Sequence, residues 1–273
     1  MAQITAAGPP AVPAPNDHQV SVTAAAAANP AAEDAADLRW RTLYRVGGWA
    51  ALIGAALIPV AMVVFIAWPP PASDAPVTEW FARFQDNQLR GLLSLDLVYM
   101  GSWLSLIPVL LALYVSLRRF GEGAMALPTV AGLMSIVVYF ASNTSVQMLL
   151  LSNGYASATT DAERSTYIAA GQAMLATYGG TAYHVSLIVG SVALILISVI
   201  MLRSRMFGTV APWAGILGNG LALGFYVPVI GLWLLVASVL PLLVWQLLLG
   251  RRLLQLGRQT SIRDTDRPTS GPS

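Results

Sequence analysis

The sequence predicts an all-α integral membrane protein, a bundle of six transmembrane helices with both the N-terminus and the C-terminus in the cytoplasm. Three observations carry this prediction: the scarcity of charge, the number of long apolar segments, and the placement of the arginines. Of the 273 residues, 56% are hydrophobic and only 10% are charged, whereas a soluble domain has about 25% charged residues. So little charge cannot cover a globule with polar surface, which favours a membrane protein.

The chain is expected to begin and end with tails. Residues 1–38 are rich in Ala and Pro and poor in large apolar side chains. Such a segment buries too little surface to offset the entropy of ordering, so we expect a disordered cytoplasmic tail. Residues 258–273 form a second expected disordered tail on the same side, and the membrane domain covers 39–257 between them.

Six apolar segments make up the membrane domain, each near the 20 residues needed to cross about 30 Å of hydrocarbon. The tract 210–249 counts as two of them because a single helix of that length, at about 1.5 Å per residue, would be twice the thickness of the bilayer. The break is expected at 225–228, where Pro228 removes a backbone donor. The predicted spans are about 43–68, 91–117, 126–151, 181–202, 209–226 and 229–250.

The arginines, which supply all 15 basic residues, set the orientation. Twelve of them precede or begin the first span, lie in the second or fourth connection, or follow the last span, and only Arg83, Arg90 and Arg164 fall on the other side. Positive charge stays in the cytoplasm, so both termini are predicted to be inside. Five spans would place the basic C-terminal tail outside, which favours six. The absence of lysine is typical of a G+C-rich bacterial genome.

The first and third connections are predicted to hold short interfacial helices. Within 74–89, apolar residues recur with the i, i+3, i+4, i+7 spacing of a helix, and this face would lie at the outer membrane interface. These residues are Val77, Trp80, Phe81 and Phe84. Within 160–178, Thr160 and Glu163 have the spacing of a capping box. Two interpretations stay open for both helices: a connector packed on the bundle, or a lid that faces a substrate.

Three stretches allow a comparison with a known family. They are LLSLDLVYMGSWLSLIPVLLALYVSLRR at 92–119, the run from LSNGYASATTDAERS to LILISVIMLRS at 151–204, and the run from GILGNGLALGFYVPVIG to LLLGRRLLQLG at 215–257. These stretches resemble the bacterial membrane-protein family called domain of unknown function 4386. The resemblance extends from about residue 40 to the mid-250s and implies a six-span helical bundle in the bacterial inner membrane. It implies no activity and no catalytic or binding residues.

Four polar side chains on three different spans are predicted at one depth. Asp96 is about five residues from the outer end of the second span, and His184 is about three residues into the fourth. Gln147 is four residues from the outer end of the third span, with Asn143 one turn deeper. At about 1.5 Å per residue, all four lie roughly 5–12 Å from the outer boundary, so we expect a polar cluster there. Three interpretations stay open: a hydrogen-bond network that fixes helix packing, a ligand or ion site, and catalysis.

A further polar residue, Asn219, lies near the middle of the fifth predicted span between Gly218 and Gly220. We interpret it as a hydrogen bond between helices at a close contact, with a ligand role as the alternative. Tyr99 and Trp103 are interpreted as core or membrane-belt aromatics. No HExxH, phosphate-binding or dinucleotide-binding motif occurs, and there is no cysteine. The sequence therefore predicts no catalytic residue, no metal site and no cofactor.

These observations favour a non-enzymatic membrane module in the bacterial inner membrane. Its expected partners are the lipid bilayer and either another protein or a second copy of the chain, and no nucleic acid is expected. The alternative is a transporter of a small molecule or ion that uses the predicted polar cluster. An intramembrane enzyme has the least support, because no nucleophile or second metal ligand accompanies His184.

Overall fold

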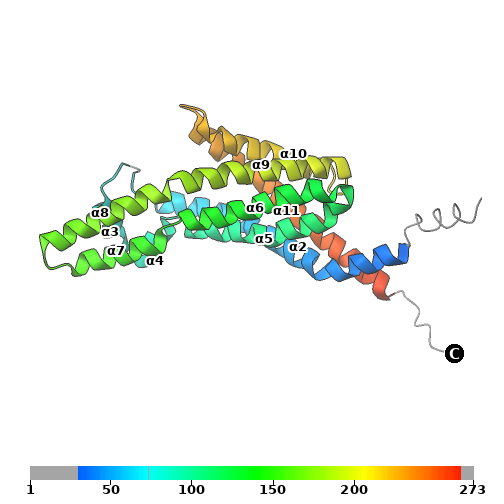
Figure 1. Cartoon of the computed structure of the whole chain (residues 1–273), viewed down its shortest axis with the longest axis horizontal. Coiled ribbons are helices and arrows are strands. Elements are labelled where there is room, and N and C mark those ends of the chain that lie inside the picture. Colours follow the sequence, from blue (N-terminus) through cyan, green and yellow to red (C-terminus); the bar gives the residue numbers. More distant parts are fainter. Residues whose placement is uncertain (1–29, 73, 266–273) are drawn as a thin grey trace, which may run out of the picture. The chain divides into compact units, whose positions relative to one another are not determined.

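The computed structural model describes the backbone of residues 30–72 and 74–265, with side chains described within 40–258. All regular structure in these ranges is helical (Figure 1). The elements are α2 (Pro30–Ala67), α3 (Val77–Asp86), α4 (Gln88–Leu93), α5 (Leu97–Leu117), η1 (Arg118–Phe120), α6 (Glu122–Ser142), α7 (Ser145–Ser157), α8 (Asp161–Tyr178), α9 (Thr181–Ser204), α10 (Val210–Leu223), η2 (Gly224–Tyr226) and α11 (Gly231–Thr265).

The two predicted tails fall largely outside the described residues, which exclude 1–29 and 266–273. Where they are described, both tails are helical, since α2 begins at Pro30 and α11 continues to Thr265. The segment 30–38 has few large apolar groups, but it is rich in Ala, the strongest helix former. A shortage of large apolar side chains therefore does not exclude a helix that continues into an apolar span.

Five helical ranges in the described part of the chain are long and apolar enough to cross a membrane. They are Trp40–Ala67, Leu97–Phe120, Glu122–Ser157, Asp161–Ser204 and Gly231–Arg258. The predicted span at 209–226 is not among them because α10 has 14 residues. At about 1.5 Å per residue, α10 is about 21 Å long, less than the thickness of the hydrocarbon. The chain is a multi-pass helical membrane protein.

Arginines from the connections mark one end of the helix bundle. The Arg118 guanidinium lies 5.6 Å from the centre of the Trp40 ring. Arg119 donates to the Met206 sulfur at 3.0 Å, and Arg252 Nε donates to the Met206 carbonyl at 2.8 Å. The early part of α2, the end of α5, the end of α9 and the later part of α11 therefore meet at this end, which we call the basic end.

Helix α10 carries the chain away from the basic end. It packs along both α9 and α11, and Gly218 lets α11 approach, since a Cβ there would lie 2.7 Å from Leu242 Cγ. The short helix η2 follows, and α11 begins at Gly231 after a turn that contains Pro228. The predicted break at 225–228 is confirmed, because proline cannot continue the helix.

A second apolar core lies outside the bundle, among α3, α4, α7 and α8, which we call the distal subdomain (Figure 1). The buried stripe of α3 packs against α7 and α8. Its members are Val77, Trp80, Phe81 and Phe84. The prediction that this face lies in the membrane interface is therefore wrong. Apolar side chains from α7 and α8, such as Tyr155 and Ile168, cover the stripe instead.

The predicted third span, 126–151, is divided in two at Asn143 and Thr144. The Asn143 side-chain oxygen accepts from the Ser145 backbone nitrogen at 3.1 Å and from the Ser145 hydroxyl at 2.6 Å. Such bonds satisfy the free donors of a new helix and favour a break. Helix α6 therefore stays in the bundle, whereas α7 continues into the distal subdomain. Helix α8, which begins with the predicted capping box of Thr160 and Glu163, leads back to α9.

Candidate functional site

The junction between the distal subdomain and the bundle contains a carboxylate with unusual backbone geometry. Asp96 directly precedes α5 in the left-handed region, with φ of 63°. Residues other than glycine are uncommon there, and such conformations gather at functional sites. The Asp96 carboxylate accepts a hydrogen bond from the Tyr178 hydroxyl at the end of α8. A single half-buried side-chain contact thus joins the start of α5 to the end of α8.

Aromatic side chains surround this carboxylate. Asp96 interacts electrostatically with the hydroxyls of Tyr99, Tyr139 and Tyr183, in addition to Tyr178. Trp103 stacks on Tyr139 with ring centroids 4.7 Å apart, and Tyr99 meets both rings edge-on. We call these six residues the Asp96 cluster. They come from α5, α6, α8 and α9 and the residue that precedes α5, so the cluster depends on how these four helices pack together.

One buried hydroxyl in the Asp96 cluster has no hydrogen-bond partner among the described residues. Tyr139 is 2% exposed, and its hydroxyl makes no hydrogen bond within the described part of the chain. A buried hydroxyl without a partner costs about 1–3 kcal/mol. A carboxylate beside an unsatisfied hydroxyl and several aromatic faces can hold a proton or a small cation, because aromatic faces attract cations.

Of the predicted cluster residues, Asn143 lies next to Asp96. Its side-chain nitrogen donates to the Leu95 carbonyl at 2.8 Å, one residue before Asp96. Because its oxygen already accepts from Ser145, both ends of the amide serve the packing of α6, α7 and the segment before α5. Asn143 therefore supports the backbone that presents Asp96, and no bond between the two side chains is present among the described contacts.

The structure separates Gln147 and His184 from Asp96. Gln147 is exposed on α7 because the break at Asn143 carries this helix out of the bundle. His184 Nδ1 lies 3.1 Å from the Tyr226 hydroxyl oxygen, and its ring packs near Phe225. The described contacts do not join these four residues in one cluster. Equal depth along separate helices does not establish that the side chains share a face.

Asn219 makes a local bond and not the predicted bond between helices. It is buried, and its side-chain nitrogen donates to the Gly215 carbonyl at 2.8 Å, one turn earlier in α10. No partner on another helix is present in the described structure. The Asn219 amide thus hydrogen-bonds to the backbone of its own helix. The close approach of α11 depends on the neighbouring glycines.

The tyrosines are not predicted as site residues, although the sequence contains a signal that could find them. Asp96 is the only acidic residue within the six predicted spans. Buried tyrosine hydroxyls need polar partners, so a lone carboxylate in an apolar bundle is where they gather. Sequence periodicity places Tyr178 only on the apolar face of the third connection. It does not reveal the contact with Asp96, because the two residues are 82 positions apart in the sequence.

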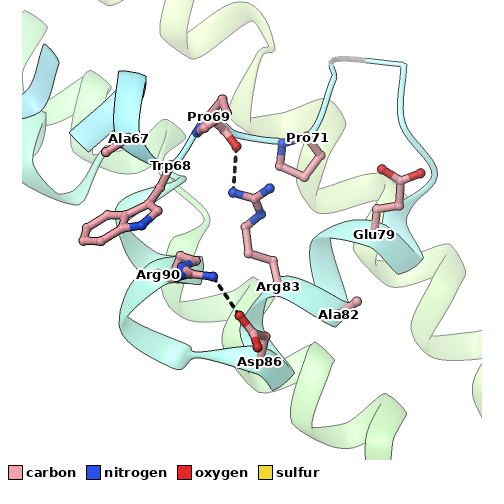
Figure 2. Close-up of a pocket in the computed structure, with 9 residues that line it drawn as sticks. All are labelled: Ala67, Trp68, Pro69, Pro71, Glu79, Ala82, Arg83, Asp86 and Arg90. Carbon is pink, nitrogen blue, oxygen red and sulfur yellow. Dashed lines mark hydrogen bonds and ion pairs between the residues drawn. The ribbon is translucent and has the colours of Figure 1, made fainter. Parts of the chain in front are cut away.

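A second candidate site is an open cavity of about 500 Å³ between the end of α2 and the polar face of α3 (Figure 2). Its charged residues are Glu79, Arg83, Asp86 and Arg90. Among the residues with described side chains, no group of three or more His, Asp or Glu is placed to hold a metal ion. The cavity and the Asp96 cluster are thus two separate candidate sites near one end of the bundle.

The apolar helices and the two cores define the class: an all-helical, multi-pass membrane protein. Comparisons of the chain with models of known protein families, with curated proteins and with solved structures found no match. The resemblance to the domain of unknown function 4386 family stays a prediction.

Proposed function

We propose that the chain is a six-span protein of the bacterial inner membrane, with both termini in the cytoplasm. We further propose that it acts as a non-enzymatic module whose distal subdomain meets lipid or protein partners on the outer side. One observation carries this proposal: two connections and the continuation of α6 build a subdomain with its own core. On its surface, Val146 and Leu150 of α7 are exposed one helical turn apart. These two side chains offer lipid or a protein partner an apolar contact on α7.

The path of α10 supports the sixth crossing. Met206, just before α10, contacts arginines of the basic end, whereas Tyr226, just after it, contacts His184 at the opposite end of α9. Together α10 and η2 extend about 27 Å, close to the thickness of the hydrocarbon, at about 1.5 Å and about 2.0 Å per residue respectively.

The basic end supports the orientation, because arginine-rich connections stay in the cytoplasm. Alkaline phosphatase fused after residue 75, 158 or 229 should be active, and fusion after residue 207 should be inactive. Inactivity after residue 229 would reduce the count to five spans, and activity after residue 207 would reverse the orientation.

The interaction surface can be tested by photo-crosslinking in cells. A photoreactive side chain in place of Leu150 should give a discrete protein or lipid adduct, which mass spectrometry identifies. The same group in place of Asp161, which is exposed at the start of α8, is the matched control. Absence of an adduct at position 150, or identical adducts at both positions, would contradict a partner surface on α7.

The Asp96 cluster favours a second candidate function, transport of a small cation or proton. An ionisable side chain within a membrane-spanning segment is a functional candidate by default, and the Asp96 side chain is half-buried. Vesicles reconstituted with the protein should then show cation or proton flux that Asp96→Asn abolishes. Glu122→Gln, a change at an exposed residue at the start of α6, should leave the flux unaltered. Absence of flux in the unaltered protein would select the non-enzymatic module.

A further inference from the structure

Helix α3 presents two opposite faces to two environments. Its apolar stripe is buried in the distal subdomain, and its polar face lines the cavity of about 500 Å³. The remaining walls come from the end of α2, the proline-rich segment after it, and α4 (Figure 2). This volume lies within the range of roughly 300–1,000 Å³ that small-molecule sites occupy. The fold thus uses the stripe to hold α3 in place and the opposite face to build a site.

The charges in the cavity are only partly paired. Arg90 Nη1 binds Asp86 Oδ2 at 2.9 Å, and the Arg90 guanidinium lies 5.6 Å from the centre of the Trp68 ring. Arg83 has the i,i+4 spacing for a pair with Glu79, a spacing that stabilises many helices. Instead, Arg83 Nη1 donates to the Pro69 carbonyl at 2.7 Å, and no ion pair involving Glu79 is present in the described residues.

Among the described contacts, the Arg83 guanidinium therefore keeps unused N–H donors, and the Glu79 carboxylate has no ion-pair partner. A guanidinium carries five N–H donors, of which Arg83 uses one on Pro69. Figure 2 shows Arg83 between Pro69 and Asp86, with Glu79 on the preceding turn of α3. A ligand with an anionic group for Arg83 and an ammonium group for Glu79 would satisfy both side chains. The Glu79 carboxylate would repel a purely anionic ligand.

The position of the cavity points to a lipid as the source of such a ligand. The apolar part of α2 ends at Ala67, and both Ala67 and the next residue, Trp68, line the cavity. In the turn before it, Val63, Phe65 and Ile66 are 64%, 58% and 75% exposed. In a multi-pass membrane protein, exposed apolar side chains face acyl chains, and Trp marks the headgroup level. A headgroup in the cavity would therefore have its acyl chains beside α2.

We propose that this cavity binds the headgroup of an outer-leaflet phospholipid that carries both a phosphate and a primary ammonium, the phosphoethanolamine group. The Arg83 fork binds the phosphate, because guanidinium and phosphate geometries match. The Glu79 carboxylate accepts from the ammonium. A trimethylammonium headgroup has no N–H to donate to Glu79, and a glycerol headgroup has no positive charge. The inference deepens the lipid interaction of the proposed function and rests on its outer orientation.

Native mass spectrometry of the full chain can test this inference. The protein is released from micelles that hold equal amounts of phosphatidylethanolamine, phosphatidylglycerol and phosphatidylcholine. We expect about ten times more phosphatidylethanolamine than either of the other two lipids to stay bound. One hydrogen bond to a charged group changes an affinity by about this factor. Equal retention of the three lipids would overturn the proposal.

Substitutions assign the two charged groups. Glu79→Gln should remove the preference for phosphatidylethanolamine over phosphatidylglycerol and leave phosphate binding in place. Arg83→Gln should weaken retention of both lipids about tenfold. Arg164→Gln, at the outer arginine outside the cavity, is the matched control and should bind as the unaltered protein does. If Arg83→Gln does not fold, Arg83→Lys should fold and bind more weakly, because lysine lacks the fork. Unchanged lipid selectivity in Glu79→Gln, or unchanged lipid retention in the folded Arg83 variants, would overturn the assignment.

Competition with soluble phosphoethanolamine distinguishes a lipid headgroup from a soluble zwitterion as the ligand. The soluble compound should not displace the lipid at equal concentration, since it lacks the acyl chains that lie beside α2. Displacement would identify a soluble zwitterion as the ligand and overturn the lipid assignment. The fusion after residue 75 reports the orientation separately, so an active fusion with no lipid preference would refute the site and leave the topology intact.

Discussion

His184 Nδ1 lies 3.1 Å from the hydroxyl oxygen of Tyr226, and this contact joins the first turn of α9 to the short helix after α10. The Tyr226 hydroxyl also lies 3.4 Å from the His184 carbonyl oxygen. The pair fixes the distance between the start of one helix and the end of its antiparallel neighbour. His184 therefore belongs to the packing of α9 and α10, and its predicted pairing with Asp96 is replaced by this contact.

A double-mutant cycle should detect this pair. His184→Ala and Tyr226→Phe together should destabilise the protein less than the sum of the single changes, with a coupling of about 0.5–1.5 kcal/mol. His184→Ala combined with Asp96→Asn should be additive within about 0.5 kcal/mol, because no described contact joins the two. The free energy of unfolding in mixed micelles measures both cycles. Coupling in the second cycle but not the first would restore the pairing expected from the sequence.

Periodicity and composition predicted the helices because these signals are local. The stripe on α3, the capping box of α8 and the break near Pro228 each depend on residues within one or two turns. The surroundings of these helices depend on distant segments. The α3 stripe fits a membrane interface and a protein core equally well, and only the apolar residues of α7 and α8 decide between them.

Asn143 should be more important for stability than its neighbour Gln147. Asn143→Ala removes three hydrogen bonds, to Leu95 and Ser145, at a buried position. We expect a loss of about 2–3 kcal/mol in the free energy of unfolding, because buried partners are left unsatisfied. Gln147→Ala changes an exposed residue and should stay within about 0.5 kcal/mol. Thermal unfolding of both variants in nanodiscs measures the difference. Similar losses for the two variants would show that the Asn143 hydrogen bonds at the break between α6 and α7 do not stabilise the protein.

The contrast between Asn143 and Gln147 also explains why the site was only partly predictable. Four polar residues were expected at one depth, but a helix break leaves Gln147 exposed on α7, and His184 contacts Tyr226 of η2. Asp96 was predicted as a site residue. Its partner Tyr178 was not, since the contact spans 82 positions of sequence.

A glycine pair tests the packing of the distal subdomain. A Cβ on Gly171 of α8 would lie 2.6 Å from Phe81 Cζ and 2.7 Å from Val77 Cγ2, both in the buried stripe of α3. Gly171→Ala should therefore destabilise the protein by about 1–3 kcal/mol through overpacking. A Cβ on Gly220 of α10 would have nothing within 4 Å. Gly220→Ala should be neutral or stabilise by about 0.5–1 kcal/mol, because alanine favours the helix.

Limited proteolysis and unfolding in denaturant distinguish the two glycine variants. Gly171→Ala should open cleavage sites in the loops around α3 and α8, whereas Gly220→Ala should give the pattern of the unaltered protein. Equal stability of the two variants would show that α8 does not rely on close approach to α3.

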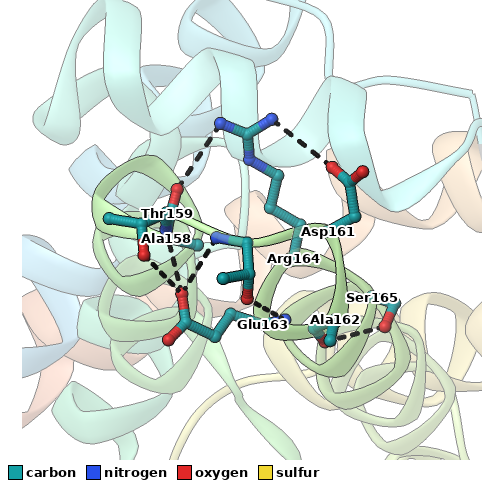
Figure 3. A network of polar contacts seen from close by, with 8 residues as sticks. Ala158, Thr159, Asp161, Ala162, Glu163, Arg164 and Ser165 are labelled. Atoms are coloured by element: carbon teal, nitrogen blue, oxygen red, sulfur yellow. Dashed lines mark hydrogen bonds and ion pairs between the residues drawn. The ribbon is translucent and has the colours of Figure 1, made fainter.

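A carboxylate in the first turn of α8 bonds to the turn between α7 and α8 (Figure 3). Glu163 Oε2 accepts from the backbone nitrogens of Thr159 at 2.9 Å and Thr160 at 3.2 Å. In return, the Thr160 hydroxyl accepts from the Glu163 backbone nitrogen at 3.2 Å. Hydrogen bonds from the backbone of Thr159 and then Thr160 hold the pKa of the Glu163 carboxyl below its ordinary value, since they favour the charged form.

The capping box should therefore loosen in acid. A carboxyl whose pKa is lowered by folding contributes stability that is fully present above its unfolded pKa. That contribution is lost as the pH falls through the lower folded pKa. Hydrogen-exchange protection factors at Thr159, Thr160 and Glu163, normalised for intrinsic rates, should hold at neutral pH and fall as the pH drops below the ordinary range of glutamate.

Two substitutions isolate Glu163 as the cause of this pH dependence. Glu163→Gln keeps a capping side chain, because glutamine also suits this position, but it removes the titration and should give pH-independent protection. Asp161→Asn changes an exposed carboxylate 4.0 Å from Arg164 and outside the capping bonds, so it should keep the acid loss. If Glu163→Gln loses protection in acid as the unaltered protein does, the loss comes from another group and the capping box does not control the stability of this turn.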